Sequence, residues 1–402
     1  MTGRGSPHAD APGTEAAAVT AAPRALPSRR VLLFANSIAV GGAETQLVRL
    51  ATGLAGRGHD VTVAVLLDLP GWEAALAAAG VHLVRLRVED RRHAAAGLVR
   101  AVALARRWRP DAVIGFDFQS SMVARLVGLL GRVPVVVSSI RNEHLGGGRA
   151  RPFVVRLTEP LTTVTTTNSH RVARSLVDRR LTRADRVRVV HNGIDVGTIA
   201  RPELVRRRTR RTLGVPSETF VWLAVAHLRP TKSLTTLFTA AEQLVADAPG
   251  DLRLFVAGGG AQLLELTAHP AVARSDRLIT LLGARDDVPE LLAAADGFVL
   301  SSTAEGLPNA IMEAMAAGLP VVSTGVGGVA ELLEDGAHGR IVAPEDPAAL
   351  AEAMRQIMAL PRSVRHAMGA AGRARVTERF GLSRMVVAWE AVLDDALAAS
   401  RR

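Results

Sequence analysis

Short apolar runs alternate with longer amphipathic stretches along most of the chain. In the first half, apolar and β-branched runs predict strands at RRVLLFANS (29–37), HDVTVAVLL (59–67), VHLVRLRV (81–88), DAVIGF (111–116) and VPVVVSSI (133–140). Apolar residues at helical spacing predict helices at GGAETQLVRLATGLAGRG (41–58), at 71–79 and at AAAGLVRAVALARRW (94–108). Strands that alternate with helices of this length predict a parallel sheet covered by helices on both faces.

The same alternation restarts after HNGID (191–195) and an arginine-rich linker. Five more strands are expected at FVWLAVAHL (220–228), LRLFVAGGG (252–260), RLITLLG (277–283), GFVLSS (297–302) and PVVSTG (320–325). A chain of 402 residues is too long for one ordinary core. We therefore predict an α/β protein of two doubly wound, Rossmann-like domains, 29–190 and 191–378, that face each other across a central cleft. A helix is expected over 379–402.

The charge is strongly positive and is carried almost entirely by arginine. Lysine and arginine number 49 against 38 acidic residues, which gives a net charge of +11, and Lys232 is the only lysine. Aromatic residues make up 3% and tyrosine is absent, so the stacking surfaces of nucleic-acid binders are missing and no nucleic-acid partner is expected. Phosphorylated small molecules and an anionic membrane surface fit better. The densest run, RPELVRRRTRR (201–211), is equally compatible with a solvated arginine face.

The absence of cysteine excludes a disulfide framework, a cysteine zinc site and a thiol nucleophile. No run of 18 uncharged apolar residues exists, so no membrane-spanning helix is expected. Residues 1–28 carry Asp10 and Glu15 where a signal peptide would be apolar, and they are rich in Ala, Pro and Gly. We expect this segment to be a disordered tail, and the protein to be cytoplasmic, either free or peripheral on the inner face of the membrane.

The most informative stretch is SSTAEGLPNAIMEAMAAGLPVVSTG (301–325). A strand ends in a glycine-bearing loop, and a helix is expected to begin near Pro308 or Asn309. The unpaired backbone amides of Gly306 and Leu307 would then form an anion site. Glu305 and Glu313 would flank a bound phosphate and accept hydrogen bonds from hydroxyl groups, which together are what a nucleotide sugar presents. The alternative is that both glutamates are ordinary surface charges.

EGLPNAIME followed by AMAAGLPVVSTGVGGVAELL resembles the E-x7-E signature of retaining GT-B glycosyltransferases of family GT4 (glycosyl transferases group 1). GGAE, HNGID, the loop with Lys232 and AGGG (257–260) agree in order, and the resemblance covers about residues 30–395. It implies a GT-B fold with an N-terminal acceptor-side domain, a C-terminal nucleotide-sugar domain and a last helix that packs back on the N-terminal domain. It also implies that a nucleoside diphosphate sugar donates its sugar to an acceptor hydroxyl with retention of anomeric configuration.

The resemblance assigns roles residue by residue. Lys232 becomes the ammonium on the leaving diphosphate, Glu305 lies against the donor sugar and its phosphate, and Glu313 binds the ribose hydroxyls. The remaining contacts to the nucleotide sugar are assigned to residues of the glycine-bearing loops, namely Gly41, Gly42, Gly258, Gly306 and Leu307. The implied acceptor is sugar- or lipid-linked, in polysaccharide, glycolipid or glycoconjugate synthesis, and the arginine-rich surface favours an anionic or lipid-phosphate acceptor.

The sequence departs from the family pattern in two places. Where the family usually has Gly-Arg-Leu, this chain has Ala226-His227-Leu228, so a cation is replaced by His227, which is neutral or only partly charged near pH 7. Arg229 could supply the missing positive charge. If it does not, the replacement by His227 would mean weaker stabilisation of the diphosphate, a different donor or loss of activity. Where the family has a sugar-contacting histidine, the candidates are Arg141 and His144, and the alternative is a loop histidine with a structural role.

Neither a metal nor another cofactor is expected, because no Asp-x-Asp occurs and cationic side chains with helix-terminal amides could carry the diphosphate charge. Gly325, Gly327 and Ala330 formally satisfy a dinucleotide-binding fingerprint, but it falls late in its domain and the next strand, RIVAP, lacks the required acid. A dinucleotide-dependent oxidoreductase is therefore the weaker enzyme alternative. The non-enzymatic alternative, favoured by His227, is a scaffold of the same fold that binds a nucleotide sugar or a membrane without turnover.

Overall fold

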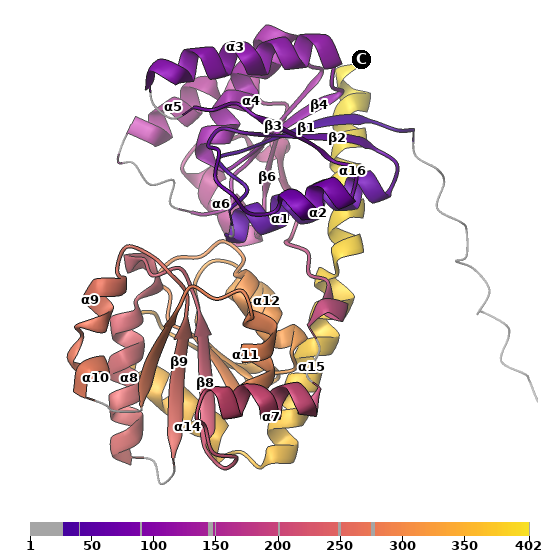
Figure 1. Ribbon diagram of the computed structural model, residues 1–402. Helices are drawn as coiled ribbons and strands as arrows, with labels where there is room; N and C mark the ends of the chain where they lie inside the picture. The colour runs from indigo at the N-terminus through magenta and orange to yellow at the C-terminus, as the bar shows by residue number, and fades with distance from the viewer. Residues whose placement is uncertain are drawn as a thin grey trace, which may run out of the picture.

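The protein folds around two parallel β-sheets, one in each half of the chain (Figure 1). The computed structural model describes residues 27–39, 41–88, 91–143, 148, 150–199, 202–247, 251–274 and 278–401. Of the tail expected over 1–28, residues 1–26 lie outside the described residues. No helix in the described ranges is both long enough and apolar enough to cross a bilayer.

The N-terminal sheet has seven strands in the order β3-β2-β1-β4-β5-β6-β7. Its strands are β1 (Arg30–Ala35), β2 (Asp60–Val65), β3 (His82–Arg85), β4 (Ala112–Phe116), β5 (Val135–Ser139), β6 (Val164–Thr167) and β7 (Val187–Val189). The helices of this half are α1 (Gly42–Gly56), α2 (Glu73–Ala78), α3 (Arg91–Trp108), α4 (Phe118–Gly131), α5 (Ala150–Thr158) and α6 (His170–Asp178). The first five strands confirm the sequence pattern, whereas β6 and β7 were not predicted.

The C-terminal sheet has six strands in the order β10-β9-β8-β11-β12-β13. Its strands are β8 (Phe220–Val225), β9 (Leu252–Ala257), β10 (Ile279–Gly283), β11 (Gly297–Leu300), β12 (Val321–Thr324) and β13 (Gly339–Val342). The helices are α7 (Glu203–Thr212), α8 (Leu234–Asp247), α9 (Leu263–Thr267), α10 (Pro270–Arg274), α11 (Val288–Ala294), α12 (Asn309–Ala316), α13 (Val329–Leu332), α14 (Pro347–Ala359), α15 (Arg362–Phe380) and α16 (Leu382–Ser400). The α/β prediction of two doubly wound sheets is confirmed.

Each sheet is buried on both faces, as the continuous apolar runs require. In β1, Val31 and Leu33 pack into a core shared with α1 and α16, whereas Leu32 and Phe34 pack into a second core shared with α3 and α4. The helix α16 therefore lies against the N-terminal sheet although it ends the chain (Figure 1). Its Trp389 stacks on Phe116 of β4, with 5.7 Å between the ring centroids.

The chain crosses between the two halves at two adjacent points. Ile194 N donates to Phe380 O at 2.9 Å, and Leu382 N donates to Ile194 O at 2.9 Å. These bonds tie the linker after β7 to the junction of α15 and α16. Both crossings are thus held together as one short piece of parallel pairing.

The strand order reverses between β1 and β4 in one sheet and between β8 and β11 in the other. In open parallel sheets, ligands bind at such switch points, because the loops that leave the carboxyl ends diverge there. The loop that carries Lys232 follows β8, and the loop that carries Glu305 follows β11. Gly41 and Gly42 follow β1. The topology therefore explains why these loops lie near the junction of the two halves.

The arginine-rich run is partly structural, contrary to both interpretations offered from the sequence. Arg206 donates to the carbonyl oxygens of Ala293, Ala294 and Ala295 and pairs with Asp296 at 2.6 Å. Arg210 is 5% exposed and also pairs with Asp296, at 3.0 Å. The two guanidinium groups therefore cap the carboxyl end of α11, a favourable place for a cation.

Candidate functional site

Lys232 and Glu305 form an ion pair at the switch point of the C-terminal sheet. Lys232 ends the 3-10 turn η4 (Pro230–Lys232), and its Nζ lies 2.5 Å from Glu305 Oε1. The Ser302 hydroxyl donates to the same oxygen at 2.6 Å. The loops are also joined by Ser301 Oγ, which donates to Lys232 O at 2.9 Å, and by Thr303 N, which donates to Thr231 O at 2.8 Å. The single lysine is thus held in place, with a side chain 20% exposed against 9% for Glu305.

Glu313 lies on α12 and meets a residue of the other half of the chain. Its Oε1 is 3.9 Å from Arg49 Nη2 on α1, and Arg49 Nη1 also donates to Gly193 O at 2.9 Å. Burial raises the pKa of Glu313, and the charge of Arg49 only partly counters this. Burial likewise lowers the pKa of Arg49. Arg49 was not predicted; it stands five residues after Glu44 on a helix, and only the folded chain brings it to Glu313.

A network of amide side chains joins the glycine loop to the start of α12. Asn309 Nδ2 donates to Gly42 O at 2.9 Å. Asn309 Oδ1 accepts from Gln46 Nε2 at 3.1 Å and from Asn192 Nδ2 at 2.7 Å. Gly193 N closes the network by donating to Gln46 Oε1 at 2.9 Å. The sequence placed Gly42 in the site but gave no role to these three amides, of which Asn309 and Asn192 lie within motifs already recognised.

The loop at Gly306 is packed directly against the N-terminal half. A Cβ at Gly306 would overlap the carbonyl oxygen of Arg141, so only glycine allows this approach. With its amide oriented so that both ends are satisfied, Asn168 accepts from Leu307 N at 3.1 Å and donates to Arg141 O at 3.3 Å. We expected the backbone N–H groups of Gly306 and Leu307 to be open to an anion. This expectation is corrected for Leu307, because its N–H donates to the side chain of Asn168.

Arg141 is buried rather than open to a sugar. It is 8% exposed, its guanidinium donates to Asn192 Oδ1, and it lies over the Phe116 ring at 5.0 Å. Burial lowers its pKa to about 10. Arg141 thus supports the junction between the halves, and His144, the other candidate for a sugar contact, lies outside the described residues.

Gly258 and His227 lie in two loops that pack against each other at the carboxyl ends of β8 and β9. Gly258 has φ of +152°, and a Cβ there would overlap the Ala226 carbonyl. His227 Nδ1 lies 3.3 Å from Gly259 O, and its side chain is exposed. Arg229 is exposed as well and forms no ion pair with a carboxylate of the described residues. Gly258 is therefore explained by backbone packing, while His227 and Arg229 remain accessible beside the loop of Lys232.

Two acidic residues of the N-terminal half were missed by the sequence reasoning. Asp117 follows β4 and caps α4, where its carboxylate accepts from Ser120 N at 3.2 Å. It has φ of +83°, a conformation that non-glycine residues rarely adopt. Burial raises its pKa to about 6, and nearby Glu44 adds to the shift. The signal available in the sequence was an acid directly after a buried strand.

One group of side chains in the described ranges could hold a metal ion. His170, His191 and Glu331 offer ligand atoms that lie within 4.8 Å of one another. His191 Nε2 is 2.8 Å from Glu331 Oε2, and Glu331 Oε1 accepts from His170 N at 2.8 Å. In this arrangement the three residues already form a polar contact between α6, the linker and α13.

Comparison with known proteins places both halves in one family. The family described as "Glycosyltransferase Family 4" matches residues 40–198, and "Glycosyl transferases group 1" matches residues 219–359. The 2-deoxystreptamine N-acetyl-D-glucosaminyltransferase of Streptomyces fradiae is 30% identical over 353 residues, which are 78% of this chain and 82% of that protein. The chain belongs to glycosyltransferase family 4. The D-inositol 3-phosphate glycosyltransferase of Salinispora tropica is 29% identical over 332 residues, 76% of this chain and 68% of that protein.

Solved structures agree on the fold of this glycosyltransferase. Anabaena Alr3699/HepE in complex with UDP and glucose superposes with a TM-score of 0.80 at 21% identity, over 91% of this chain and 100% of that one. The sucrose-phosphate synthase of Thermosynechococcus elongatus gives 0.76 at 19% identity, over 92% of this chain and 100% of that one. The glycosyltransferase thus has the GT-B fold expected from the resemblance.

Family membership also decides against the oxidoreductase alternative. In this glycosyltransferase the glycines of the apparent fingerprint serve packing: a Cβ at Gly327, which has φ of +54°, would overlap the Glu305 carbonyl. Gly325 N donates to Val342 O at 2.8 Å. The segment therefore lies beneath the loop of Glu305 and supports it.

Proposed function

We propose that this family 4 glycosyltransferase moves a sugar from a nucleoside diphosphate donor to an acceptor hydroxyl and retains the anomeric configuration. The observation that carries the proposal is the Lys232–Glu305 pair at the switch point, 2.5 Å apart and 73 residues apart in sequence. A diphosphate gains negative charge as its bond to the sugar breaks, so a positioned ammonium stabilises the transition state more than the ground state. The C-terminal half would hold the donor and the N-terminal half would receive the acceptor.

Lys232 would exchange one partner for another when the donor binds. In the structure its ammonium is neutralised by Glu305, and a diphosphate placed beside it would compete for the same charge. Glu305 would then be free to accept hydrogen bonds from sugar hydroxyls. Exposed Arg229 lies two residues from His227 and could add a second positive charge. With these groups, diphosphate binding requires no metal ion.

Transfer would proceed on one face of the sugar. The bond from the anomeric carbon to the phosphate oxygen breaks, a bond to the acceptor oxygen forms on the same face, and the acceptor proton passes to the leaving phosphate. Glu305 keeps the Ser302 hydroxyl as a donor when Lys232 turns to the diphosphate. A carboxylate oxygen that accepts hydrogen bonds is a weaker nucleophile, which favours this route over one in which Glu305 attacks the sugar. Glu313, held near Arg49, would bind the ribose hydroxyls.

The acceptor is proposed to be a sugar- or lipid-linked hydroxyl compound. The names of the relatives point to hydroxylated acceptors of varied charge: D-inositol 3-phosphate, 2-deoxystreptamine and L-malate. Glu44 in the first turn of α1 and Asp117 directly after β4 line one small hollow and support a neutral or amine-bearing acceptor more than an anionic one. An acceptor panel should therefore contain all three charge types.

The test combines donor binding with product stereochemistry. Thermal unfolding in the presence of nucleoside diphosphates identifies the base, and turnover of the matching nucleotide sugars is then followed by release of nucleoside diphosphate. The anomeric configuration of the product, read by NMR, must equal that of the donor. An inverted product would disprove retention. Tight donor binding without turnover for any acceptor would favour the non-catalytic scaffold instead.

A further inference from the structure

The three helices α3, α4 and α5 form a layer with a one-sided charge. They cover the same face of the N-terminal sheet, with α4 between α3 and α5 (Figure 1). Arg106 of α3 donates to Leu130 O of α4, and Arg125 of α4 donates to Val155 O of α5. Together the three helices contain eight arginines and no aspartate or glutamate. By contrast, α1, α2 and α16 on the opposite face contain five acidic residues.

The outer surface of this layer is also unusually apolar. On α5, Phe153 and Leu157 are 63% and 68% exposed and lie one helical turn apart, opposite the buried Val155. Seven of the fourteen exposed large hydrophobic side chains in the described ranges belong to these three helices: Val99, Leu126, Leu129, Leu130, Phe153, Val154 and Leu157. We call these seven residues, with the arginines of α3 and α5, the α3–α5 face. A gathering of exposed apolar side chains on one layer is a feature of interaction sites.

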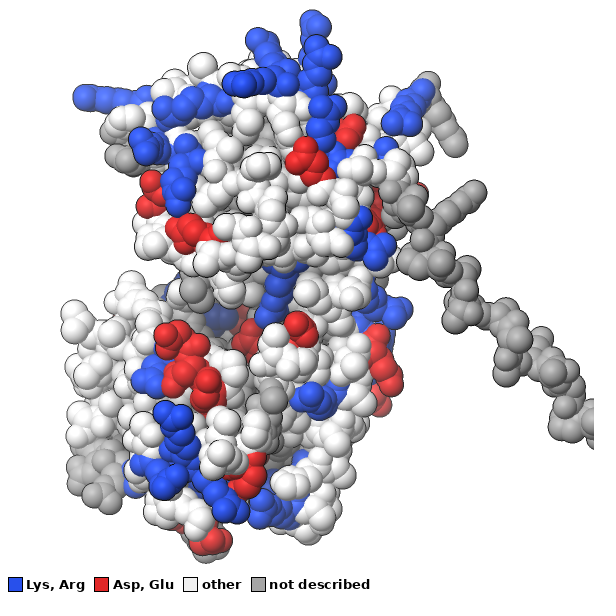
Figure 2. Space-filling model, turned by 45° about the vertical axis from the view of Figure 1, so that its right-hand side comes forward, with Lys and Arg blue, Asp and Glu red and all other residues white. Residues whose placement is uncertain are grey.

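Two arginines of this face, Arg106 and Arg156, contact backbone carbonyls and form no ion pair with a carboxylate of the described residues. Arg106 and Arg156 donate to the backbone carbonyls of Leu130 and Arg179, which do not neutralise a guanidinium. Figure 2 shows Lys and Arg side chains gathered along the top of the molecule, where Figure 1 places α3. The layer that exposes these apolar side chains therefore also carries positive charge, with no acidic residue on its three helices.

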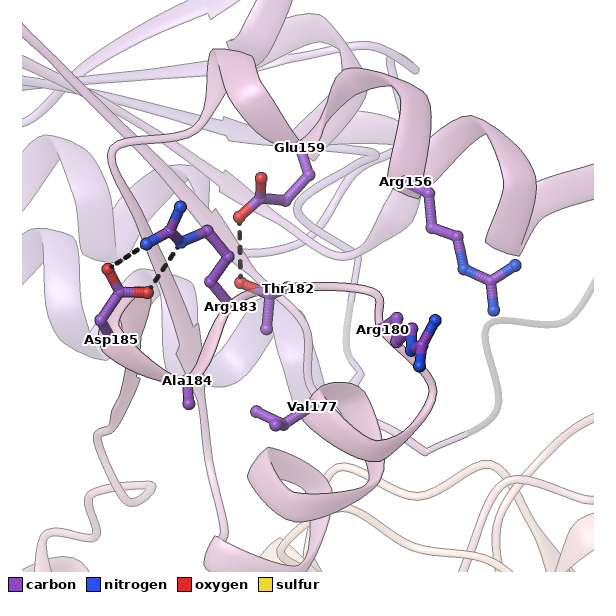
Figure 3. A pocket seen from close by; sticks show the side chains of 8 residues that line it. All are labelled: Arg156, Glu159, Val177, Arg180, Thr182, Arg183, Ala184 and Asp185. Atoms are coloured by element: carbon purple, nitrogen blue, oxygen red, sulfur yellow. Dashed lines mark hydrogen bonds and ion pairs between the residues drawn. The ribbon is translucent and has the colours of Figure 1, made fainter.

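A hollow of about 560 Å³ adjoins α5 and contains further arginines. Arg156, Arg180 and Arg183 line it together with Glu159 and Asp185. Arg183 is paired with Asp185 at 2.9 Å, whereas Arg156 and Arg180 lie on the side of the hollow away from Asp185 (Figure 3). Two guanidinium groups at the rim suit phosphate groups, which they can bind with paired hydrogen bonds.

We infer that the α3–α5 face docks this protein on an anionic lipid surface. Phe153 and Leu157 would enter the boundary between headgroups and acyl chains, and the surrounding arginines would lie at the level of the lipid phosphates. A nucleic acid offers no apolar phase for leucine side chains. A second copy of the same face would bring two positive layers together, which charge repulsion opposes. An anionic bilayer is the occupant that satisfies both the charge and the apolar area.

The experiment is vesicle flotation of the full chain. Vesicles of phosphatidylcholine with phosphatidylglycerol are compared with phosphatidylcholine alone, at low and physiological salt. F153S/L157S is expected to weaken binding to the anionic vesicles by about 10- to 100-fold, since each apolar side chain loses its burial. The matched control is L264S on α9, where Leu264 is 86% exposed but lies in the C-terminal half, and it should bind like the wild type. R156Q/R180Q should weaken binding mainly at low salt, and R211Q on α7 should not.

Three results would overturn the inference. The first is a wild-type chain that does not float with anionic vesicles. The second is F153S/L157S binding as tightly as the wild type, or L264S losing binding equally. The third is a concentration-dependent dimer in light scattering that F153S/L157S abolishes, which would make the face a self-association surface. Donor binding and turnover are measured without vesicles, so failure of this inference and failure of the proposed transfer are separate results.

Discussion

Replacement of Lys232 by Met tests the proposed chemistry and its structural cost separately. The substitution keeps most of the side-chain length but removes the ammonium that lies 2.5 Å from Glu305 Oε1. Glu305, 9% exposed, would retain the Ser302 hydroxyl as a donor but would lose its positive partner. Breaking a buried pair costs about 3–5 kcal/mol, and since Lys232 is a fifth exposed we expect about 2–3 kcal/mol of unfolding free energy.

The effect on transfer should be larger than stability explains. Loss of one charge aimed at the leaving group lowers turnover by about 10²- to 10³-fold in comparable sites. The assay is release of nucleoside diphosphate from the best donor, measured well below the unfolding transition of each variant. Urea unfolding of the same preparations gives the stability term.

The double variant K232M/E305Q separates the two roles. The neutral amide introduced by E305Q would need no counter-ion, so most of the lost unfolding free energy should return, while turnover should stay low. K232R is the charge-retaining control: it should remain stable but be slower than the wild type, because a planar guanidinium does not place its charge like an ammonium. Turnover of K232M within about twofold of wild type would refute the assigned role. Recovery of turnover in the double variant would show that Lys232 acts only on the structure.

Three further outcomes follow from other contacts. G306A should separate the two halves, because its methyl group would overlap a backbone carbonyl of the N-terminal half. Small-angle scattering should then show a larger radius of gyration. G56A is the control: a Cβ at Gly56 meets open space, so the radius of gyration should not change. The raised pKa of Asp117, about 6 against an ordinary 3.8, means that the folded state binds its proton more tightly, so stability falls as pH rises from about 4 to 6. D117N should remove this pH dependence of stability in thermal unfolding and raise the free energy of unfolding by up to about 3 kcal/mol at pH 7. The same pH dependence in D117N and wild type would contradict a raised pKa of Asp117. Burial raises the pKa of Glu390, but hydrogen bonds from Arg57 and His59 lower it by more, so the net pKa is below its ordinary value. The contribution of the Glu390 carboxylate to stability is therefore present above about pH 4.5 and lost as the pH falls. E390Q should therefore destabilise at pH 7 by about 1–3 kcal/mol, with a difference that shrinks in urea unfolding near pH 4.

The sequence by itself determined most strands of the two sheets and the fold class, because continuous apolar runs and helical spacing are local properties of the chain. It also located the loops at Lys232 and Glu305 and the start of α12 at Asn309. It missed β6, whose sequence VTTT lacks an apolar run although Thr165, Thr166 and Thr167 are all buried. Partners for such hydroxyl groups come from other elements: Thr165 finds one in Thr182 at 3.1 Å, whereas the Thr166 hydroxyl has none among the described residues.

Only the tertiary structure decided which charges meet. Lys232 reaches Glu305 because the strand order reverses between β8 and β11, and no local pattern encodes that reversal. Arg49 reaches Glu313 only where the two halves join. Arg206 and Arg210 of α7 looked like part of a surface run but cap α11. The arginines of α3 and α5, by contrast, lie on a layer whose three helices contain no acidic residue. The physical reason is that periodicity in the sequence reports which side of one element is buried. The role of a charged side chain depends instead on the groups that other elements bring within a few ångströms of it.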